Sequence, residues 1–179
     1  PFWFSELQLD FTDAVFESVS GITTTGATII AGLDESPPGL LLWRAILQWL
    51  GGIGIIVMAL SLLPFLGIGG MQLFRTESSE SEKALPRTTE LAKNISLIYI
   101  GLTIACMVFY MFTGLGLFEA VCHALTTIST GGFSTHDTSF MDMGRIDREI
   151  VCTLFMLSGS IPFVLYLKFL RGDRNAILQ

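Results

Sequence analysis

Two short polar loops interrupt an otherwise apolar sequence and constrain its fold more than any other feature. They are 21–29 (GITTTGATI) and 127–135 (TISTGGFST), both rich in threonine and glycine. The sequence is 51% hydrophobic and 15% charged, whereas soluble domains are typically about 25% charged. A bilayer tolerates irregular backbone only where protein buries it or where it lines a water-filled cavity. The loops therefore predict peptide and hydroxyl oxygens that replace the hydration shell of an ion.

Each loop follows a segment that is helical in pattern but too short to cross a membrane. The first begins at Thr12 or Asp13, either of which can cap a helix, and runs to about Ser20. The second covers 119–128. A helix of about ten residues is about 15 Å long, half of a hydrocarbon core of about 30 Å. Both segments are predicted to enter the membrane and return on the same side.

Three longer apolar segments, 40–66, 95–112 and 150–170, are predicted to span the bilayer. The third is expected to break at the Ser-Gly-Ser sequence 158–160 and at Pro162. Breaks of this kind free carbonyls that need partners, so this region is expected either to line a conduction path or to form a simple proline kink.

These elements divide the chain into two units of a repeat. Residues 1–67 are expected to hold a pore helix, a filter loop and a span, and 94–174 a complete span–pore loop–span unit. Residues 68–93 form a predicted cytoplasmic loop, and 175–179 form a tail. Because the pattern is cut at both ends, we expect the chain to be a piece of a longer protein.

Basic residues predict which side of the membrane each end faces. Those that follow the first and last spans are Arg75, Lys83, Arg87, Lys93, Lys168, Arg171 and Arg174. Basic residues favour the cytoplasmic side, so both polar loops open from the outside. The formal net charge of -6 argues against a nucleic-acid partner.

The two short helices and their loops align without a gap. The alignment pairs Asp13 with Glu119, Thr24 with Thr130, and Gly26 with Gly132. Glycine permits backbone conformations in which successive carbonyls face one side. The carboxyl end of each helix offers a partial negative charge to a cation, while the acids lie at the amino ends. No carboxylate lies within either loop, which disfavours a divalent cation and favours a potassium-like ion.

Simpler structural interpretations exist for several of these residues. Gly26 and Gly132 could merely end helices, as glycine commonly does. The glycines at 51, 52 and 54 are expected to thin the first span so that the short helix packs closely against it. Arg44, near the outer end of that span, is expected to reach the interface or to be paired.

The sequence as a whole resembles the TrkH potassium-uptake family, which is related to KtrB and the plant HKT transporters. The motifs that carry the resemblance are 20–29 (SGITTTGATI), 47–57 (LQWLGGIGIIV), 67–73 (GIGGMQL) and 128–137 (ISTGGFSTHD). The resemblance implies an all-α membrane protein with span–re-entrant pore helix–filter loop–span repeats. Four such units would form a pseudo-fourfold, potassium-channel-like pore, and this chain would supply the later part of the second unit and the third.

The resemblance also implies which residues bind K⁺, the transported ion. By analogy with potassium channels they are Thr24, Thr25, Gly26 and Ala27 in the first loop and Thr130, Gly131, Gly132 and Phe133 in the second. Family members carry an intramembrane gating loop below the filter, which would correspond to Ser158, Gly159 and Ser160. No cofactor is implied.

The function that follows is potassium uptake by a multi-pass protein of the bacterial inner membrane. The implied partners are a second copy of the protein and a cytoplasmic, TrkA-like nucleotide-binding regulator. A Na⁺-permeable or Na⁺-coupled relative is the alternative within transport. Two alternatives of other classes are a non-conducting membrane scaffold and an intramembrane hydrolase. The hydrolase would use Ser158 or Ser160 as nucleophile and His123 or His136 as base, although we expect these histidines to be a packing residue and a loop residue.

Overall fold

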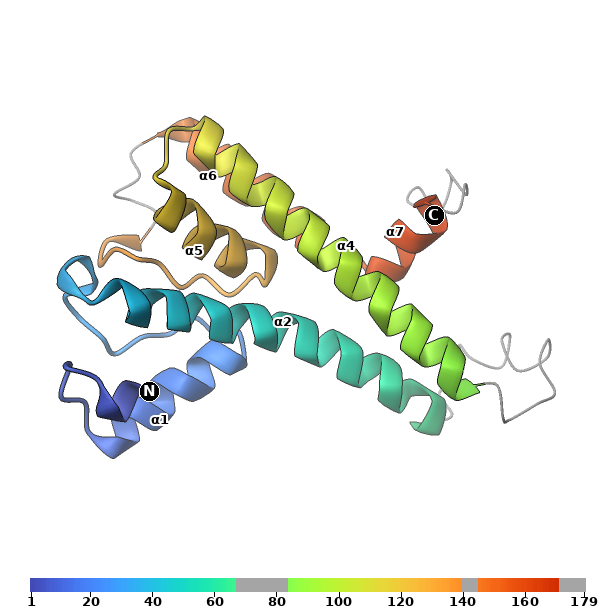
Figure 1. Ribbon diagram of the computed structural model, residues 1–179, viewed down its shortest axis with the longest axis horizontal. Helices are drawn as coiled ribbons and strands as arrows, with labels where there is room; N and C mark the ends of the chain where they lie inside the picture. The colour runs from blue at the N-terminus through green and yellow to red at the C-terminus, as the bar shows by residue number, and fades with distance from the viewer. Residues whose placement is uncertain (67–83, 140–144, 171–179) are drawn as a thin grey trace.

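The computed structural model describes residues 1–66, 84–139 and 145–170, and every regular element within these ranges is a helix. The 3-10 helices are η1 (Phe2–Phe4) and η2 (Leu33–Glu35), and the α-helices are α1 (Phe11–Ile22), α2 (Pro38–Leu66), α4 (Ala84–Phe112), α5 (Leu117–Ile128), α6 (Ile146–Ser160) and α7 (Phe163–Leu170) (Figure 1). The predicted all-α fold is confirmed for this part of the chain.

The two short helices, α1 and α5, are 12 residues each and have the predicted hairpin geometry. In Figure 1 both run from the left end of the molecule toward its middle, and the loops that follow return to the left end. The predicted cap at Thr12 or Asp13 is wrong, because the N-cap is Asp10, two residues before Thr12, and α1 begins at Phe11. The side chain of Asp10 makes no capping hydrogen bond, and its extended backbone alone starts the helix.

The long helices α2 and α4 are 29 residues each, about 44 Å at 1.5 Å per residue. The prediction of a loop over 68–93 is wrong from residue 84 onward, where α4 has already begun. A helix bonds its own backbone, so it can extend past the apolar segment into polar surroundings. In the ranges that the structure describes, one segment, Glu90–Phe112, is long and apolar enough to cross a membrane. The other two spans stay predictions, as does the tail at 175–179, which lies outside the described residues.

The predicted break in the third span is present, but it lies after the Ser-Gly-Ser sequence. Ser160 is the last residue of α6, and Ile161 has an extended backbone with ψ of 133°. Pro162 explains this position, because proline lacks an amide hydrogen and disfavours a helical conformation in the residue before it. The helix therefore contains 158–160, and α7 then turns away from the line of α4 in Figure 1.

The two short helices are enclosed to different degrees. Helix α5 packs against α2, α4 and α6, and its residues Ala120, Ala124 and Ile128 belong to the larger core. Helix α1 packs chiefly against α2 and leaves apolar side chains such as Phe11 and Val19 exposed. The more complete copy of the repeat is therefore the better packed one.

Both short helices end against a glycine of the span that follows them. A Cβ on Gly51 would lie 2.0 Å from the carbonyl oxygen of Ile22, and one on Gly159 would lie 2.6 Å from that of Ile128. Ile22 and Ile128 are aligned positions of the repeat. The predicted close packing is thus confirmed at Gly51, whereas a Cβ on Gly54 would have no neighbouring atom within 4 Å, so Gly54 does not contribute.

This contact predicts unequal effects for two alanine substitutions in α2. Gly51→Ala forces a methyl into the backbone of Ile22, and overpacking of this kind costs about 1–3 kcal/mol. Gly54→Ala is the matched control, since it adds a methyl in open space and replaces glycine by a better helix former. We expect the melting temperature of the purified protein in detergent to fall for the first variant only. Equal melting temperatures for both variants would contradict the close contact.

Candidate functional site

The candidate site lies where the loops after α1 and α5 meet. A Cβ on Gly26 would lie only 2.0 Å from the carbonyl oxygen of Gly131, so the loops touch at this point. Gly26 also has φ of 76°, a conformation that other residues adopt only with strain. The sequence predicted both loops as filter elements, and the structure brings them together.

The two loops share an unusual backbone pattern. Thr24 and Thr130 have φ of 56° and 54°, and the glycines two positions later, Gly26 and Gly132, have φ of 76° and 86°. A positive φ is rare and costly for a β-branched residue such as threonine. Strain of this kind persists only where the surroundings impose it, and it is concentrated at functional sites. The predicted alignment of the two loops therefore holds at the level of backbone conformation.

The same pattern rules out the interpretation that Gly26 and Gly132 merely end the helices. Each helix ends in a Schellman motif, which consists of a six-to-one and a five-to-two backbone hydrogen bond. The residue with the left-handed conformation in this motif is Thr24 after α1 and Thr130 after α5. The bonds join the amides of Thr25, Thr24, Gly131 and Thr130 to the carbonyls of Ser20, Gly21, Thr126 and Thr127 at 2.9–3.0 Å. The glycines lie two residues beyond these caps, so their conformation shapes the loop itself.

Most carbonyls of the predicted filter residues are available to a ligand. Within the described residues, no donor bonds the carbonyl oxygens of Thr24, Thr25, Gly26, Thr130, Gly131, Gly132 and Phe133. Ala27 differs, because its carbonyl accepts a hydrogen bond from the hydroxyl of Ser20 at 2.5 Å. Unengaged peptide oxygens in a mostly apolar protein are costly unless an ion or water contacts them.

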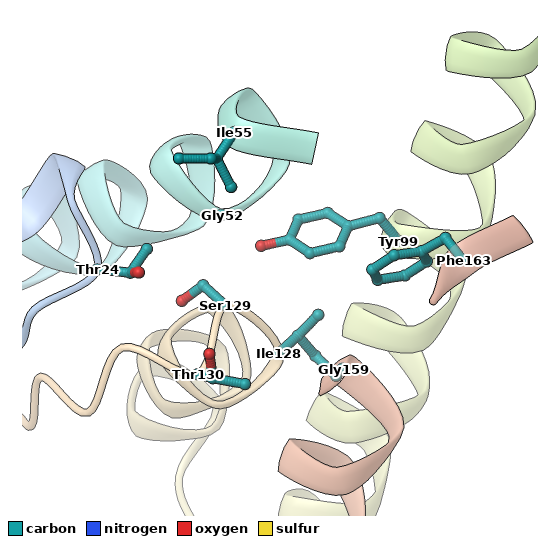
Figure 2. A pocket seen from close by; sticks show the side chains of 9 residues that line it. All are labelled: Thr24, Gly52, Ile55, Tyr99, Ile128, Ser129, Thr130, Gly159 and Phe163. Carbon is teal, nitrogen blue, oxygen red and sulfur yellow. The ribbon is translucent and has the colours of Figure 1, made fainter. Parts of the chain in front are cut away.

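A cavity of about 200 Å³ lies at the carboxyl ends of the two short helices. Thr24 and Thr130, the first predicted filter residue of each loop, line it together with Ser129 (Figure 2). The opposite wall includes Tyr99 of α4 and Gly159 of α6. Figure 2 shows the Tyr99 hydroxyl directed toward the space beside Gly52. The cavity therefore offers hydroxyl groups beside the point where both helix dipoles are negative.

The three residues predicted as a gate occupy different positions around this cavity. Gly159 lines it, whereas the hydroxyls of Ser158 and Ser160 donate to carbonyls of the preceding helical turn, at 2.8 and 2.9 Å. The Ser158 carbonyl accepts a hydrogen bond from the Tyr166 hydroxyl of α7 at 2.7 Å. Of the three residues, Gly159 is the one found among those that line the cavity, and the gating role of the segment stays a prediction.

The buried polar side chains that contact both loops from α1 and α2 were not predicted from the sequence. Arg44 of α2 is 1% exposed and forms an ion pair with Glu17 of α1, which is fully buried, at 2.8 Å. Gln48, one turn after Arg44, is also fully buried and accepts a hydrogen bond from the amide of Phe133 at 3.1 Å. Of the two predictions for Arg44, that it reaches the interface or that it is paired, the second is confirmed. The sequence signal for this buried group was Arg44 and Gln48, spaced by four in an apolar segment, together with the acid Glu17 in the apolar helix before it.

The connections beyond the two loops are joined by His136. Its Nδ1 lies 2.5 Å from Asp34 and its Nε2 lies 3.2 Å from Glu119. The hydrogen bond with Asp34 raises the pKa of His136 above its usual 6.5, because it favours the protonated ring. The same bond lowers the pKa of Asp34. Asp137 adds a further link, since its carboxylate accepts hydrogen bonds from the amides of Gly32 and Leu33 at 2.9 and 3.1 Å.

The histidines are engaged in ways that disfavour the hydrolase. His123 is fully buried, as expected for a packing residue, and its Nε2 lies 3.2 Å from the hydroxyl of Thr135. His136 binds carboxylates in the outer connection. The hydroxyls of Ser158 and Ser160 are bonded within their own helix, so neither serine is paired with a base as nucleophilic catalysis requires.

Comparison with known proteins points to one family. Residues 1–175 match the family model TrkH, described as a cation transport protein. The Trk system potassium uptake protein TrkI of Halomonas elongata is 51% identical over 174 residues, covering 96% of this chain and 35% of that protein. The corresponding TrkH protein of Escherichia coli K12 is 46% identical over 176 residues, covering 96% of this chain and 36% of that protein.

The fold comparison agrees with the sequence comparison. The crystal structure of the potassium transporter TrkH from Vibrio parahaemolyticus matches with a TM-score of 0.81 and 42% sequence identity. The match covers 94% of this chain and 34% of that protein. The chain spans about a third of the length of the curated relatives it matches.

The His136 contacts predict a pH-dependent link between the outer connections. Because the pKa of His136 is raised on folding, its stabilising contribution is fully present below pH 6.5 and is lost as the pH rises through the raised pKa. We expect the wild-type protein to melt above the His136→Asn variant at about pH 6 and to lose that advantage as the pH rises through the raised pKa of His136. Asp34→Asn should weaken the same pH dependence, and the contact of His136 with Glu119 should retain part of it. A difference in melting temperature that is constant with pH would contradict the link.

Proposed function

Because the chain belongs to the TrkH family of cation transport proteins, we propose that it supplies two neighbouring quarters of a potassium-selective filter. The observation that carries the proposal is the repeated loop backbone, with left-handed residues at Thr24 and Gly26 and again at Thr130 and Gly132. Two positive φ values at alternate positions orient successive peptide groups in the same way in both loops. The relatives named above as potassium uptake proteins support K⁺ as the ion.

The chemistry of the site suits a monovalent cation that has lost its water. The loops offer carbonyl oxygens and contain no carboxylate, so the ion meets partial rather than full negative charges. Helices α1 and α5 direct their carboxyl ends at the cavity next to these oxygens, and each end carries about half an elementary negative charge. An ion entering from the outer side would pass the loops first and the cavity next.

The proposal extends to the whole transporter of which this chain would be about a third. Two loops provide half of a four-loop filter, so selective conduction requires the remaining units. We propose a location in the bacterial inner membrane, a homodimeric assembly and a cytoplasmic TrkA-like nucleotide-binding regulator. Family membership supports these three points. The 158–160 segment would act as the gate, supported by the position of Gly159 against the cavity.

Serine substitutions at the two filter glycines test the assignment. Gly26→Ser and Gly132→Ser place a side chain on left-handed residues of the loops, and each should abolish Rb⁺ uptake or reduce the preference for Rb⁺ over Na⁺. Gly32→Ser is the matched control for Gly132→Ser, because both glycines have a positive φ and open space around an added Cβ, while Gly32 lies outside the predicted filter. All three variants carry a left-handed strain of about 1–2 kcal/mol. Gly26→Ser adds a contact of 2.0 Å between the new Cβ and the carbonyl oxygen of Gly131, so its uptake has to be compared with its membrane level.

Uptake should be measured in cells that lack other potassium transporters, with the full-length protein and with its membrane level recorded. We expect normal membrane levels for Gly132→Ser and Gly32→Ser, a lower level for Gly26→Ser, and altered uptake per transporter for the two filter variants only. Unchanged uptake and selectivity in both filter variants would refute the filter assignment. A wild-type protein that takes up Na⁺ as readily as Rb⁺ would favour the Na⁺-permeable alternative.

A further inference from the structure

Helix α2 presents two buried polar side chains to both filter loops at once. Arg44 and Gln48 are one helical turn apart and are 1% and 0% exposed. Buried charged and amide groups are costly in a membrane protein and are usually tied to function. Helix α2 belongs to the first unit, yet both side chains contact the loop of the second.

The guanidinium of Arg44 uses each of its three nitrogens on a different element. Its Nε donates to Glu17 of α1 at 2.8 Å. Its Nη2 donates to the hydroxyl of Thr28, just after the predicted filter residues of the first loop, at 3.0 Å. Its Nη1 donates to the carbonyl of Ser134, just after those of the second loop, at 3.0 Å. The planar group also lies 4.1 Å from the ring centre of Phe133.

Glu17 completes the attachment of the first loop. Its carboxylate accepts a hydrogen bond from the Thr28 hydroxyl at 2.9 Å and from the amide of Ile29 at 3.3 Å. Together with Arg44, the carboxylate forms a closed network in which Thr28 is both donor and acceptor. Networks that satisfy every member hold one geometry and make alternatives costly.

The side chain of Gln48 lies beside the point where Gly26 and Gly131 of the two loops touch. Its Oε1 accepts the amide hydrogen of Phe133 at 3.1 Å. A Cβ on Gly131 would lie 2.4 Å from the Gln48 side chain, and a Cβ on Gly26 would lie 3.6 Å from its Nε2. The amide group is therefore packed tightly against Gly131 and lies near Gly26. Its position limits how closely the loops can approach and how far Phe133 can move.

The two copies of the repeat differ at the position that holds the loop. Glu17 aligns with His123, which contacts Thr135 of its own loop rather than a cation on α2. The second loop consequently receives its charged support from Arg44, which belongs to the first unit. One side chain thus bridges two units that are far apart in sequence.

We propose that Arg44 and Gln48 form a positioning pair that sets the spacing of the two filter loops and thereby determines the preference for K⁺ over Na⁺. The proposal rests on the filter function proposed above. Discrimination between these ions requires oxygens held at a defined number and distance, and the loops themselves have little regular hydrogen bonding. Arginine suits the task because its rigid fork fixes several acceptors in one plane, which lysine cannot do.

The test compares charge, geometry and stability in the full-length transporter. Arg44→Lys retains the charge but loses the fork, and Gln48→Met retains the volume but loses the acceptor for Phe133. Each should lower the ratio of Rb⁺ to Na⁺ uptake by about tenfold or more, the size expected for lost hydrogen bonds to charged or buried groups. Leu50→Met, at a half-exposed position of the same helix, is the control and should leave the ratio unchanged.

A double variant separates positioning from folding. Arg44→Met or Glu17→Leu alone leaves a buried unpaired charge and should lower the membrane level and the melting temperature. The double variant Arg44→Met/Glu17→Leu removes both charges, so it should recover stability while the uptake ratio stays low. Recovery of the ratio together with stability would overturn the proposal.

The outcomes also separate this proposal from the filter function. A wild-type transporter without any preference for Rb⁺ over Na⁺ would refute the proposed function. A selective wild-type transporter whose Arg44→Lys and Gln48→Met variants keep the same ratio would leave the filter in place and overturn the positioning pair. Gln48→Met changes no charge, so it provides a result even where the Arg44 variants fail to accumulate.

Discussion

Peptide carbonyls without hydrogen-bond partners are costly in an apolar protein, and the loops that carry them have to be held by other parts of the structure. Here the support comes from α2, whose Arg44 donates to Thr28 and Ser134, just beyond the predicted filter residues of each loop, and whose Gln48 accepts a hydrogen bond from the amide of Phe133. Among the described residues, these bonds leave the carbonyl oxygens of the predicted filter residues without a donor, except that of Ala27. The arrangement fixes the loops without occupying their ligating atoms.

A second constraint sets how far each loop reaches into the molecule. Gly51 of α2 and Gly159 of α6 each lie against the last carbonyl of the short helix in their own unit. Because a side chain at either position would collide with backbone, the short helix and the span that follows it lie in close contact at these glycines. The two loops therefore start from equivalent contacts, and their left-handed residues fall at matching positions of the repeat.

The loops of the two units have the same backbone conformation, but the buried polar side chains beside them differ. The first unit holds its loop with the Glu17–Arg44 pair, and the second has His123 and Thr135 at the corresponding place. A repeat that conserved every side chain would place two ion pairs close together behind one filter. Because the second unit has no such pair, Arg44–Glu17 is the one buried ion pair beside the two loops among the described residues. The second loop consequently depends on α2, a helix of the first unit, for its bond to a charged side chain.

The local elements could be predicted from the sequence because they depend on short-range patterns. The two short helices, the paired threonines and glycines, and the break near Pro162 were all visible as composition and spacing. The start of α4 at Ala84 was missed because a helix that leaves the apolar segment carries no hydropathy signal. The break was expected both at 158–160 and at Pro162, and the structure has it at Ile161, where the steric effect of Pro162 acts.

The sequence by itself determined that two equivalent irregular loops exist and what oxygens they carry, because backbone preference and residue type are local properties. Only the tertiary structure decided how those loops are spaced. Arg44, Gln48 and Glu17 are remote in sequence from the second loop, and their roles arise from helices packed side by side. Spacing between loops is a long-range quantity, so no pattern within either loop could contain it.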